Sequence, residues 1–491
     1  MKNEDIYNSI SEIDGKLINE AEDHKLSEKP HGRVRKRLLI SALSAALAVV
    51  SVAGIVLYPH GEKSALAAYA IARPEYPEML RYPEISDENN PTREDAENYM
   101  KWKESVAERT KRSAEYAEGM DSFYKKVLPE LLSVGEESNA AFSPASMYLA
   151  LGMLAECTGG DSLAQILDLL GKGTLEEARS TSRKMWFANY IDDGITKSVI
   201  SNSMWLNNKI DFKEKTLNSI AENYYASSFS GEMGSDSMNK LLREWINENT
   251  GQMLSKDVKD IEITPNTAIA LVNTLCFSAE WENKFSESFT HENVFHAKSG
   301  DVSAEYMGRD GFIGDYLIGE NFTAAELEFD FGGKMTFWLP NEGVSVDELL
   351  RDEKAAACIS LGSISKTDET SRYFLNLRIP KFDITSNVDM ISCLTDLGVK
   401  NIFNSDTSVF TPLYNETQLP TYVSDIKNAA RVKIDEDGCE GVSYIAVIMY
   451  ASAAGPGEKE ADFILNRPFI FTVTGPTGDI LFAGTVGNPT K

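Results

Sequence analysis

Histidine is the side chain most often used as a general base or a zinc ligand near neutral pH, and this chain has only five. His24, His31 and His60 lie in the polar N-terminal part, whereas His291 and His296 are five residues apart in "THENVFHAKSG". Two ligands on one helical face need a spacing of three or four, and in a strand a spacing of five places them on opposite faces. We therefore expect His291 and His296 to be solvent-exposed.

The other residues that could do chemistry form no recognisable catalytic or metal site. No GxSxG, HExxH, GxGxxG or Walker A motif stands in the strand–turn–helix setting that it requires. The cysteines are odd in number and scattered, with no CxxC pair, so we expect buried thiols: Cys157, Cys276, Cys358, Cys393 and Cys439. We predict that the protein is not an enzyme and needs no metal or cofactor.

Composition and charge bound the remaining possibilities. An apolar fraction of 42% in 491 residues is ample for a large core. The net charge of −27 makes nucleic acids and anionic lipid poor partners, because phosphate groups would be repelled.

The N-terminal part predicts a membrane anchor. The run 38–58 carries no charge and is long enough to cross a bilayer as a helix. The basic cluster "RVRKR" precedes it directly, which predicts a cytoplasmic tail at 1–37, a transmembrane signal anchor at 38–58 and an extracytoplasmic linker at 59–111. In the alternative, a signal peptide is cut after Ala65-Leu66-Ala67 and the protein is secreted.

Residues 112–491 predict a domain that mixes helices and strands. "NAAFSPASMYLALGMLAECTGGDSLAQILDLLG" predicts a short strand and an apolar helix that starts at Ser143-Pro144 and stops at Gly159-Gly160. Two hairpins are expected, with turns at Gly332-Gly333 and at 476–478, and "YFLNLRIPKFDITS" predicts one further strand. Helices gather early and strands late, which indicates an α+β fold with large mixed sheets.

One stretch combines features that a permanent strand would not have. In "KIDEDGCEGVSYIAVIMYASAAGPGEKEADFILNRPFIF", strand-forming residues follow an acidic glycine turn and then give way to small residues and a Gly-Pro-Gly loop. The composition indicates a segment that is a strand only part of the time.

Several motifs in this order resemble those of the serpin (serine protease inhibitor) family. The resemblance covers about 113–491 and rests on "NAAFSPASMYLALGMLAECTGGDSLAQIL", "SNSMWLN", "ALVNTLCFSAEWENKF", "LRIPKFDI", "LTDLGVKNIFN", "KIDEDGCEG" and "NRPFIFTV…GDILFAGTVGNP". It implies a serpin fold with a helical N-terminal half, in a bacterial membrane-tethered type of serpin. It also implies an exposed reactive-centre loop that a serine protease cleaves and that then inserts into a large sheet, trapping the protease covalently; we expect a monomer.

The resemblance assigns the hinge of that loop to Glu436, Gly438, Cys439, Glu440, Gly441, Val442, Ser443, Tyr444 and Ile445. An inserting strand alternates between two faces. Cys439, Gly441 and Ser443 begin a set, continued by 445 and 447, that has no charge or aromatic ring and is assigned to the buried face. Val442 and Tyr444 are bulkier than the family's usual alanines, so slow insertion is expected. The alternative function is therefore a non-inhibitory serpin-fold binding protein that is cleaved as a substrate.

By the same resemblance, Ser143 and Asn273 match the polar cluster beneath the opening sheet, and Trp281 matches the aromatic residue where the loop first enters. Ordinary core packing is the alternative role for all three.

Two counts compete for the scissile bond. Counting back from Pro468 places it near Gly457, whereas counting forward from Glu436 as the seventeenth residue before the bond gives Ser452–Ala453. We prefer the forward count, because about 17 residues at about 3.3 Å each span about 56 Å, the length of such a domain. A serine with alanine on both sides predicts an elastase-like or subtilisin-like protease. Met449 and Tyr450 are the fallback positions.

Overall fold

A computed structural model describes residues 69–83, 92–114, 119–133, 138–194, 196–252, 254–255, 257–330, 332–386, 390–414, 421–423, 426, 430–439 and 459–491. Two compact units divide the chain: 1–64 with 83–102, and 65–82 with 103–491. Helix α2 (Arg93–Ala114) has residues in both units, and its start at Thr92 is in the first; the Thr92 hydroxyl accepts a hydrogen bond from the Asp95 backbone, while the Asp95 carboxylate accepts one from the Thr92 N–H.

The first of two large sheets has eight strands. Its order is β1-β5-β4-β6-β14-β13-β12, and β3 pairs with β4 at the side. The strands are β1 (Ala70–Ala72), β3 (Ile191–Asp192), β4 (Lys197–Asn207), β5 (Ala226–Gly231), β6 (Ile269–Glu280), β12 (Phe382–Ser386), β13 (Ala430–Ile434) and β14 (Gly438–Cys439).

The second sheet has nine strands in the order β15-β11-β8-β9-β10-β16-β17-β2, with β7 paired to β8. They are β2 (Ala140–Phe142), β7 (His291–Ala297), β8 (Gly300–Ile318), β9 (Phe322–Glu328), β10 (Lys334–Pro340), β11 (Ser371–Pro380), β15 (Lys459–Ile464), β16 (Phe469–Thr474) and β17 (Ile480–Val486). Every residue of β16 and β17 is buried, which explains why the closing hairpin reads as two continuous apolar runs.

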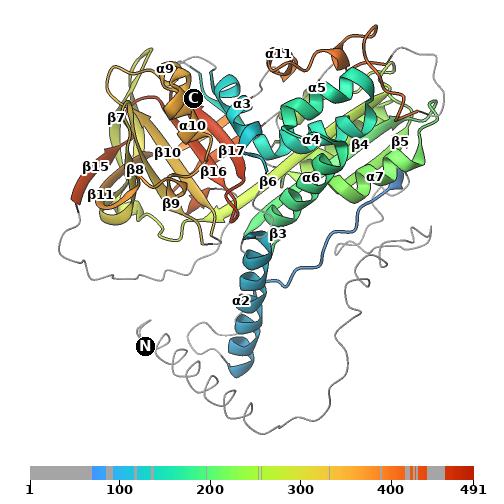
Figure 1. The fold of residues 1–491 in the computed structure, drawn as a ribbon. Coiled ribbons are helices and arrows are strands. Elements are labelled where there is room, and N and C mark those ends of the chain that lie inside the picture. The colour runs from blue at the N-terminus through green and yellow to red at the C-terminus, as the bar shows by residue number, and fades with distance from the viewer. Residues whose placement is uncertain are drawn as a thin grey trace, which may run out of the picture. The chain divides into compact units, whose positions relative to one another are not determined.

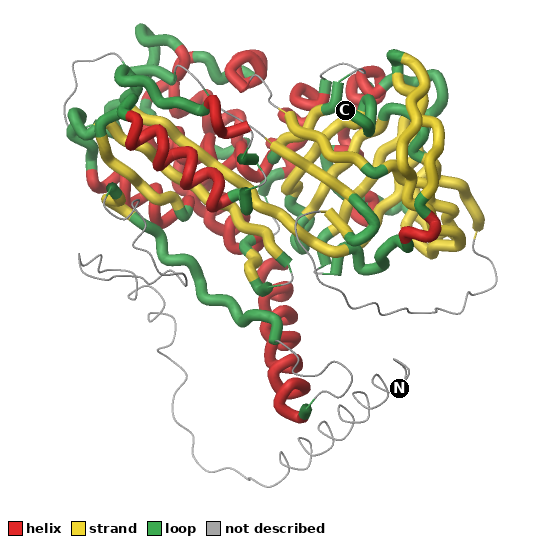
Figure 2. The backbone as a smooth tube through the Cα atoms, turned by 180° about the vertical axis from the view of Figure 1, so that it is seen from behind, coloured by secondary structure: helices red, strands yellow, loops and turns green. Residues whose placement is uncertain are grey.

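Helices gather beside the eight-stranded sheet and around one end of the nine-stranded sheet (Figures 1 and 2). They are α3 (Asp121–Leu132), α4 (Pro144–Cys157), α5 (Gly160–Leu170), α6 (Leu175–Asn189), α7 (Glu214–Tyr224), α8 (Asp236–Asn249), α9 (Val346–Arg351), α10 (Glu353–Ile359) and α11 (Met390–Asp396). Helix α4 is buried on nearly every side and packs on α5, α6, α7, β6 and β17, so it links the two sheets.

The structure confirms the α+β class, both hairpins and the helix break at Gly159-Gly160. The single strand predicted for "YFLNLRIPKFDITS" is wrong, because the chain changes sheets at Lys381. Pro380 has no N–H to continue the ladder, and the Lys381 N–H donates to the Glu305 carbonyl (2.8 Å) instead. Within the described residues no helix has the length and apolar character needed to span a bilayer, and the predicted anchor 38–58 lies outside them.

Candidate functional site

The predicted hinge enters the eight-stranded sheet between β6 and β13. Gly438 pairs with Glu280 and Cys439 with Ala279 on β6, while Cys439 also pairs with Ile434 on β13. Cys439 is buried, so the first member of the uncharged set lies inside the protein. The other hinge residues after Cys439 (440–445), the bond Ser452–Ala453 and the fallback Met449 and Tyr450 lie outside the described residues.

Only glycine fits at position 438. A Cβ atom there would lie 2.2 Å from the Ala279 carbonyl oxygen and 2.8 Å from the Glu280 Cα, both backbone atoms that cannot move aside. The glycine thus allows the hinge to approach β6 closely enough to pair.

Strand β6 is bonded very differently along its two edges. One edge pairs with β4 from Ser278 to Ile269, almost the whole strand. Among the described residues, the other edge pairs only at Glu280 and Ala279. The remaining ten positions, about 33 Å of strand, have no described partner there. Each residue of 269–273 is half-buried, which is unusual for the middle of a sheet.

Trp281 directly follows β6, at the end of the strand where Glu280 and Ala279 pair with the hinge. Its indole Nε1 donates to the Asp435 carbonyl (2.9 Å) and its backbone N–H donates to the Asp437 carbonyl (2.9 Å). The buried ring stacks on Phe329, with 4.9 Å between centroids. Trp281 therefore holds the turn that leads from β13 into the hinge.

Glu436, in the same turn, is held by three contacts. Its carboxylate accepts hydrogen bonds from Thr290 Oγ1 (2.7 Å) and Lys381 Nζ (3.4 Å), and its carbonyl accepts one from the Phe285 N–H (3.0 Å). Burial alone would raise the pKa of Glu436, but the Thr290 hydrogen bond and the Lys381 charge outweigh it and hold the pKa below its usual value. Lys381 also pairs with Glu305 (3.2 Å), so this turn is tied to the nine-stranded sheet.

Ser143 and Asn273 have separate partners. Ser143 caps α4, its hydroxyl accepting a hydrogen bond from the Ser146 N–H (3.1 Å). Asn273, in the middle of β6, donates to Asn202 Oδ1 (2.5 Å), and its own buried Oδ1 has no hydrogen-bond partner among the described residues. Asn273 thus lies where the β6 edge is open, while Ser143 begins the helix beneath it.

The residue types that could support enzymatic or metal chemistry do not assemble into a site. His291 and His296 are both exposed on β7, and His296 Nδ1 lies 2.8 Å from the Asp301 carboxylate. Among the described residues no disulfide joins the five cysteines, and Cys358 alone of them is half-buried; burial raises the pKa of its thiol to about 11. Within the described part of the chain, no three His, Cys, Asp or Glu residues gather as metal ligands.

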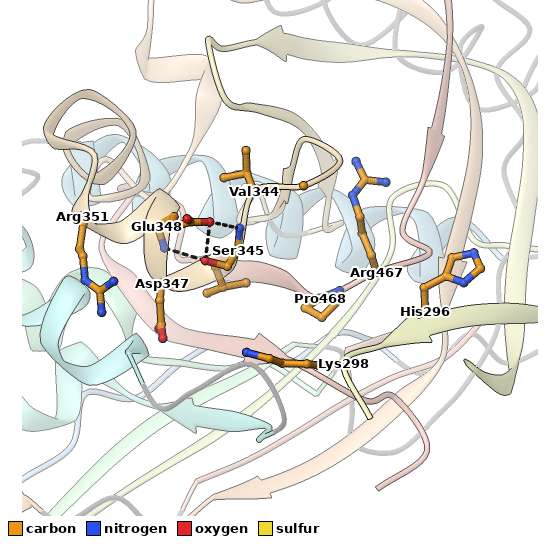
Figure 3. Close-up of a pocket in the computed structure, with 11 residues that line it drawn as sticks. His296, Lys298, Val344, Ser345, Asp347, Glu348, Arg351, Arg467 and Pro468 are labelled. Carbon is orange, nitrogen blue, oxygen red and sulfur yellow. Dashed lines mark hydrogen bonds between the residues drawn. The ribbon is translucent and has the colours of Figure 1, made fainter. Parts of the chain in front are cut away.

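A surface cavity of about 570 Å³ is lined by residues from 296–298, 343–351 and 467–468. Its charged lining does not converge on one point: the side chains of Arg351 and Arg467 lie on opposite sides and point in different directions, and Glu348 is occupied in capping Ser345 (Figure 3). The lining residues are His296, Lys298, Gly343, Val344, Ser345, Val346, Asp347, Glu348, Arg351, Arg467 and Pro468.

Sequence reasoning missed the residues that secure the hinge turn. Lys381 stands in the quoted segment "LRIPKFDI", but its contact with Glu436 joins residues 55 apart. Phe285 ends the quoted segment "ALVNTLCFSAEWENKF", but it contacts Glu436 through its backbone N–H, which its residue type does not indicate, and Thr290 carries no local sequence signal for such a role.

Comparison with known proteins identifies relatives over most of this unit. The family model for serpins (serine protease inhibitors) matches residues 118–489. Serpin-ZX of Arabidopsis thaliana is 25% identical over 374 residues, covering 73% of this chain and 94% of the relative. Serpin B4 of Homo sapiens is 26% identical over 378 residues, covering 72% of this chain and 94% of the relative.

Solved structures share the fold. The thermophilic serpin tengpin in its native state gives a TM-score of 0.66 at 24% identity, covering 76% of this chain and 94% of that chain. Human thyroxine-binding globulin complexed with thyroxine gives a TM-score of 0.64 at 21% identity, covering 77% of this chain and 100% of that chain.

Proposed function

The chain belongs to the serpin family, and from that premise we propose that it inhibits serine proteases by forming a covalent complex with them. The observation that carries the proposal is the edge of β6 facing β13, where the described residues pair only at Glu280 and Ala279, and they pair there with the start of the hinge.

The register of the hinge extends naturally into an inserted strand. Continuing the antiparallel pairing from Gly438–Glu280 and Cys439–Ala279 places Ser443 opposite Leu275 and Val447 opposite Leu271. Directly opposed residues point to the same side of a sheet. Ala279 and Phe277 belong to the main core, and Leu275 and Leu271 pack against it. This supports the buried assignment of Cys439, Gly441, Ser443, Ile445 and Val447.

The proposed reaction begins as ordinary acyl transfer. The protease serine attacks the Ser452 carbonyl, the Ser452–Ala453 bond breaks, and the new amine at Ala453 leaves, so that Ser452 stays esterified to the protease. Insertion of the freed strand carries the bound protease along the sheet before water can hydrolyse the ester.

Strand length supports Ser452–Ala453 over a later bond. The pairing reaches Ile269, the first residue of β6, at Met449. Ser452 then lies three residues beyond the sheet, whereas a cut near Gly457 would leave a long unpaired tail. The other side of the loop ends in β15, which pairs in parallel with β11 from Lys459 to Ile464.

We place the target among elastase-like or subtilisin-like proteases, because a small serine side chain suits a shallow specificity pocket. Incubating the protein with a panel of serine proteases tests the proposal. An SDS-stable adduct supports inhibition, and a cleaved loop without adduct supports the non-inhibitory alternative. Mass spectrometry of the released fragment identifies the bond: it should begin at Ala453, a start at Ala451 indicates the fallback, and a start beyond Lys459 refutes the assignment.

The proposed location is the outer face of a membrane, with the serpin unit tethered by 38–58 and 1–37 inside the cell. Protease added to intact cells should then release the serpin unit. Recovery of the full-length chain in the soluble cytoplasmic fraction would contradict this topology, and a soluble extracellular chain lacking 1–67 would support signal cleavage.

A further inference from the structure

Two buried hydroxyl groups lie side by side in the eight-stranded sheet without a partner. Ser201 of β4 and Thr274 of β6 are directly opposed in the antiparallel pairing of the two strands, and they are 1% and 7% exposed. Neither side-chain oxygen has a hydrogen-bond partner among the described residues. A buried hydroxyl without a partner destabilises a protein, so the presence of two in one place calls for an explanation.

Both hydroxyls face α8 rather than the main core. Trp205 lies an even number of residues further along β4 than Ser201, so the two side chains share one face of the sheet. Trp205 belongs to the second core cluster, which the buried side chains of α8 complete. Thr274 points to the same side, because directly opposed residues share a face.

The neighbouring hydroxyl on this face does have partners. Ser203 Oγ accepts a hydrogen bond from Trp205 Nε1 (2.9 Å) and donates one to the Val272 carbonyl (3.3 Å). The sheet beneath α8 therefore satisfies a hydroxyl where the described residues supply a partner. Ser201 and Thr274 differ from Ser203 in that the described residues supply none.

The proposed insertion would bring one side chain to these two hydroxyls. Continuing the hinge register by five residues from the Cys439–Ala279 pair would place Tyr444 opposite Thr274. Thr274 is in turn opposite Ser201, so the three residues would form one row across three adjacent strands. The row would lie on the α8 side of the sheet, since directly opposed residues share a face.

A tyrosine has the length and the chemistry that this row requires. At a spacing of about 4.8 Å per strand, the inserted segment would lie about 9.6 Å from β4. An aromatic side chain reaches past its nearest neighbour, so a ring resting on Thr274 would carry its hydroxyl toward Ser201. A phenolic hydroxyl both donates and accepts hydrogen bonds, and it usually has a partner when it is buried.

We propose that Ser201 and Thr274 form the receiving site for Tyr444 in the inserted strand, with the ring on Thr274 and its hydroxyl bonded to Ser201. This inference rests on the proposed insertion mechanism and adds a positioning residue to it. The large ring slows entry of the strand, but once in place it fixes the register. A slip of two residues would bring Val442 or Ala446 to the site, and neither side chain can satisfy a hydroxyl.

The test is a double-mutant cycle on the intact and the cleaved full-length chain. The loop is cut with thermolysin, a zinc protease that forms no acyl bond with its substrate, and mass spectrometry confirms a cut between 450 and 458. Wild type, Tyr444→Phe, Ser201→Ala and the double variant are then unfolded at one concentration of guanidinium chloride. In the cleaved form, Tyr444→Phe should unfold about five times faster than wild type, in line with the loss of one hydrogen bond. The double variant should unfold no faster than Tyr444→Phe, because both changes remove the same bond.

Tyr450→Phe is the matched control within the same loop. The pairing would reach Ile269, the first residue of β6, at Met449, so residue 450 would lie beyond the sheet. Tyr450→Phe should therefore unfold at the wild-type rate in both forms. Tyr444→Phe should unfold at the wild-type rate in the intact chain, because its hydroxyl has not yet entered the sheet.

Different results would refute the inference and the proposed function. If cleaved wild type unfolds no more slowly than the intact chain, insertion is refuted and the inference falls with it. If cleavage slows unfolding but the effects of Tyr444→Phe and Ser201→Ala are additive, Ser201 does not receive Tyr444, although insertion stands. Should Ser201→Ala fail to fold, equal unfolding rates for cleaved Tyr444→Phe and cleaved Tyr450→Phe would overturn the inference on their own.

Discussion

Ser443→Arg is the substitution that most sharply probes the direction in which the inserting strand faces. If the pairing seen at Gly438 and Cys439 continues along β6 as we propose, the inserted residue 443 would lie opposite Leu275, which packs against the main core. An arginine at this position would be harmless in the uncleaved loop but would carry its charge into the core during insertion.

The expected size of the effect follows from burial of an unpaired charge. Breaking a buried ion pair so that one charge is left alone typically costs about 3–5 kcal/mol, and an arginine without a partner faces the same penalty. If about 3 kcal/mol of this appears in the barrier, insertion slows by a factor of about 150. Hydrolysis of the acyl bond then precedes insertion, and the variant becomes a substrate.

The assay compares adduct yield and cleavage rate for Ser443→Arg, Glu440→Arg and wild type. Glu440 would lie opposite the half-buried Ser278 and is already charged, so an arginine there should leave the adduct yield close to that of wild type. Ser443→Arg should be cleaved at the wild-type rate but give little adduct. The assignment of faces is off by one residue if Ser443→Arg keeps the wild-type adduct yield and Glu440→Arg loses it.

Three further changes probe the hinge turn. Gly438→Ala should expel β14 from the sheet, because its Cβ would meet the Ala279 carbonyl; we expect a loss of about 1–3 kcal/mol in urea unfolding and less adduct. Glu436→Gln should cost about 1 kcal/mol at neutral pH through loss of the Lys381 ion pair. The pKa of Glu436 is lower in the folded protein than in the unfolded chain, so the ionised carboxylate stabilises the folded protein at every pH above the unfolded pKa. This stabilisation is lost as the pH falls through the folded pKa. The free energy of unfolding of Glu436→Gln in urea should therefore change less with acidic pH than that of wild type. Trp281→Ala should lower the free energy of unfolding by about 3–5 kcal/mol, because the ring is buried.

Sequence patterns were informative where local chemistry decides the structure. The turn at Gly332-Gly333 and the Ser143–Pro144 helix start depend on residues adjacent in sequence, and both elements are found. The fold class follows from the order of these elements and the motifs that accompany them. The proposed scissile bond and most of the hinge stay predictions, because 440–458 lies outside the described residues.

Contacts between distant segments could not be predicted in this way. Residues 69–82 read as a proline-rich linker in the sequence. Their order depends on partners more than 100 residues away, because Ala70 pairs with Phe229 and Tyr76 stacks on Trp186. The Glu436–Lys381 pair and the division of β11 from β12 at Lys381 likewise depend on where the two sheets meet, which no local pattern records.

Thermal unfolding of the protein before and after cleavage within 440–458 tests the central claim most directly. If the freed segment becomes a strand between β6 and β13, it fills the open edge of β6, and the cleaved protein should unfold at a temperature higher by about 10 °C or more. Cleaved Ser443→Arg should show a much smaller rise. A cleaved wild-type protein that unfolds at the same or a lower temperature than the intact chain would contradict insertion, and with it the proposed mechanism of inhibition.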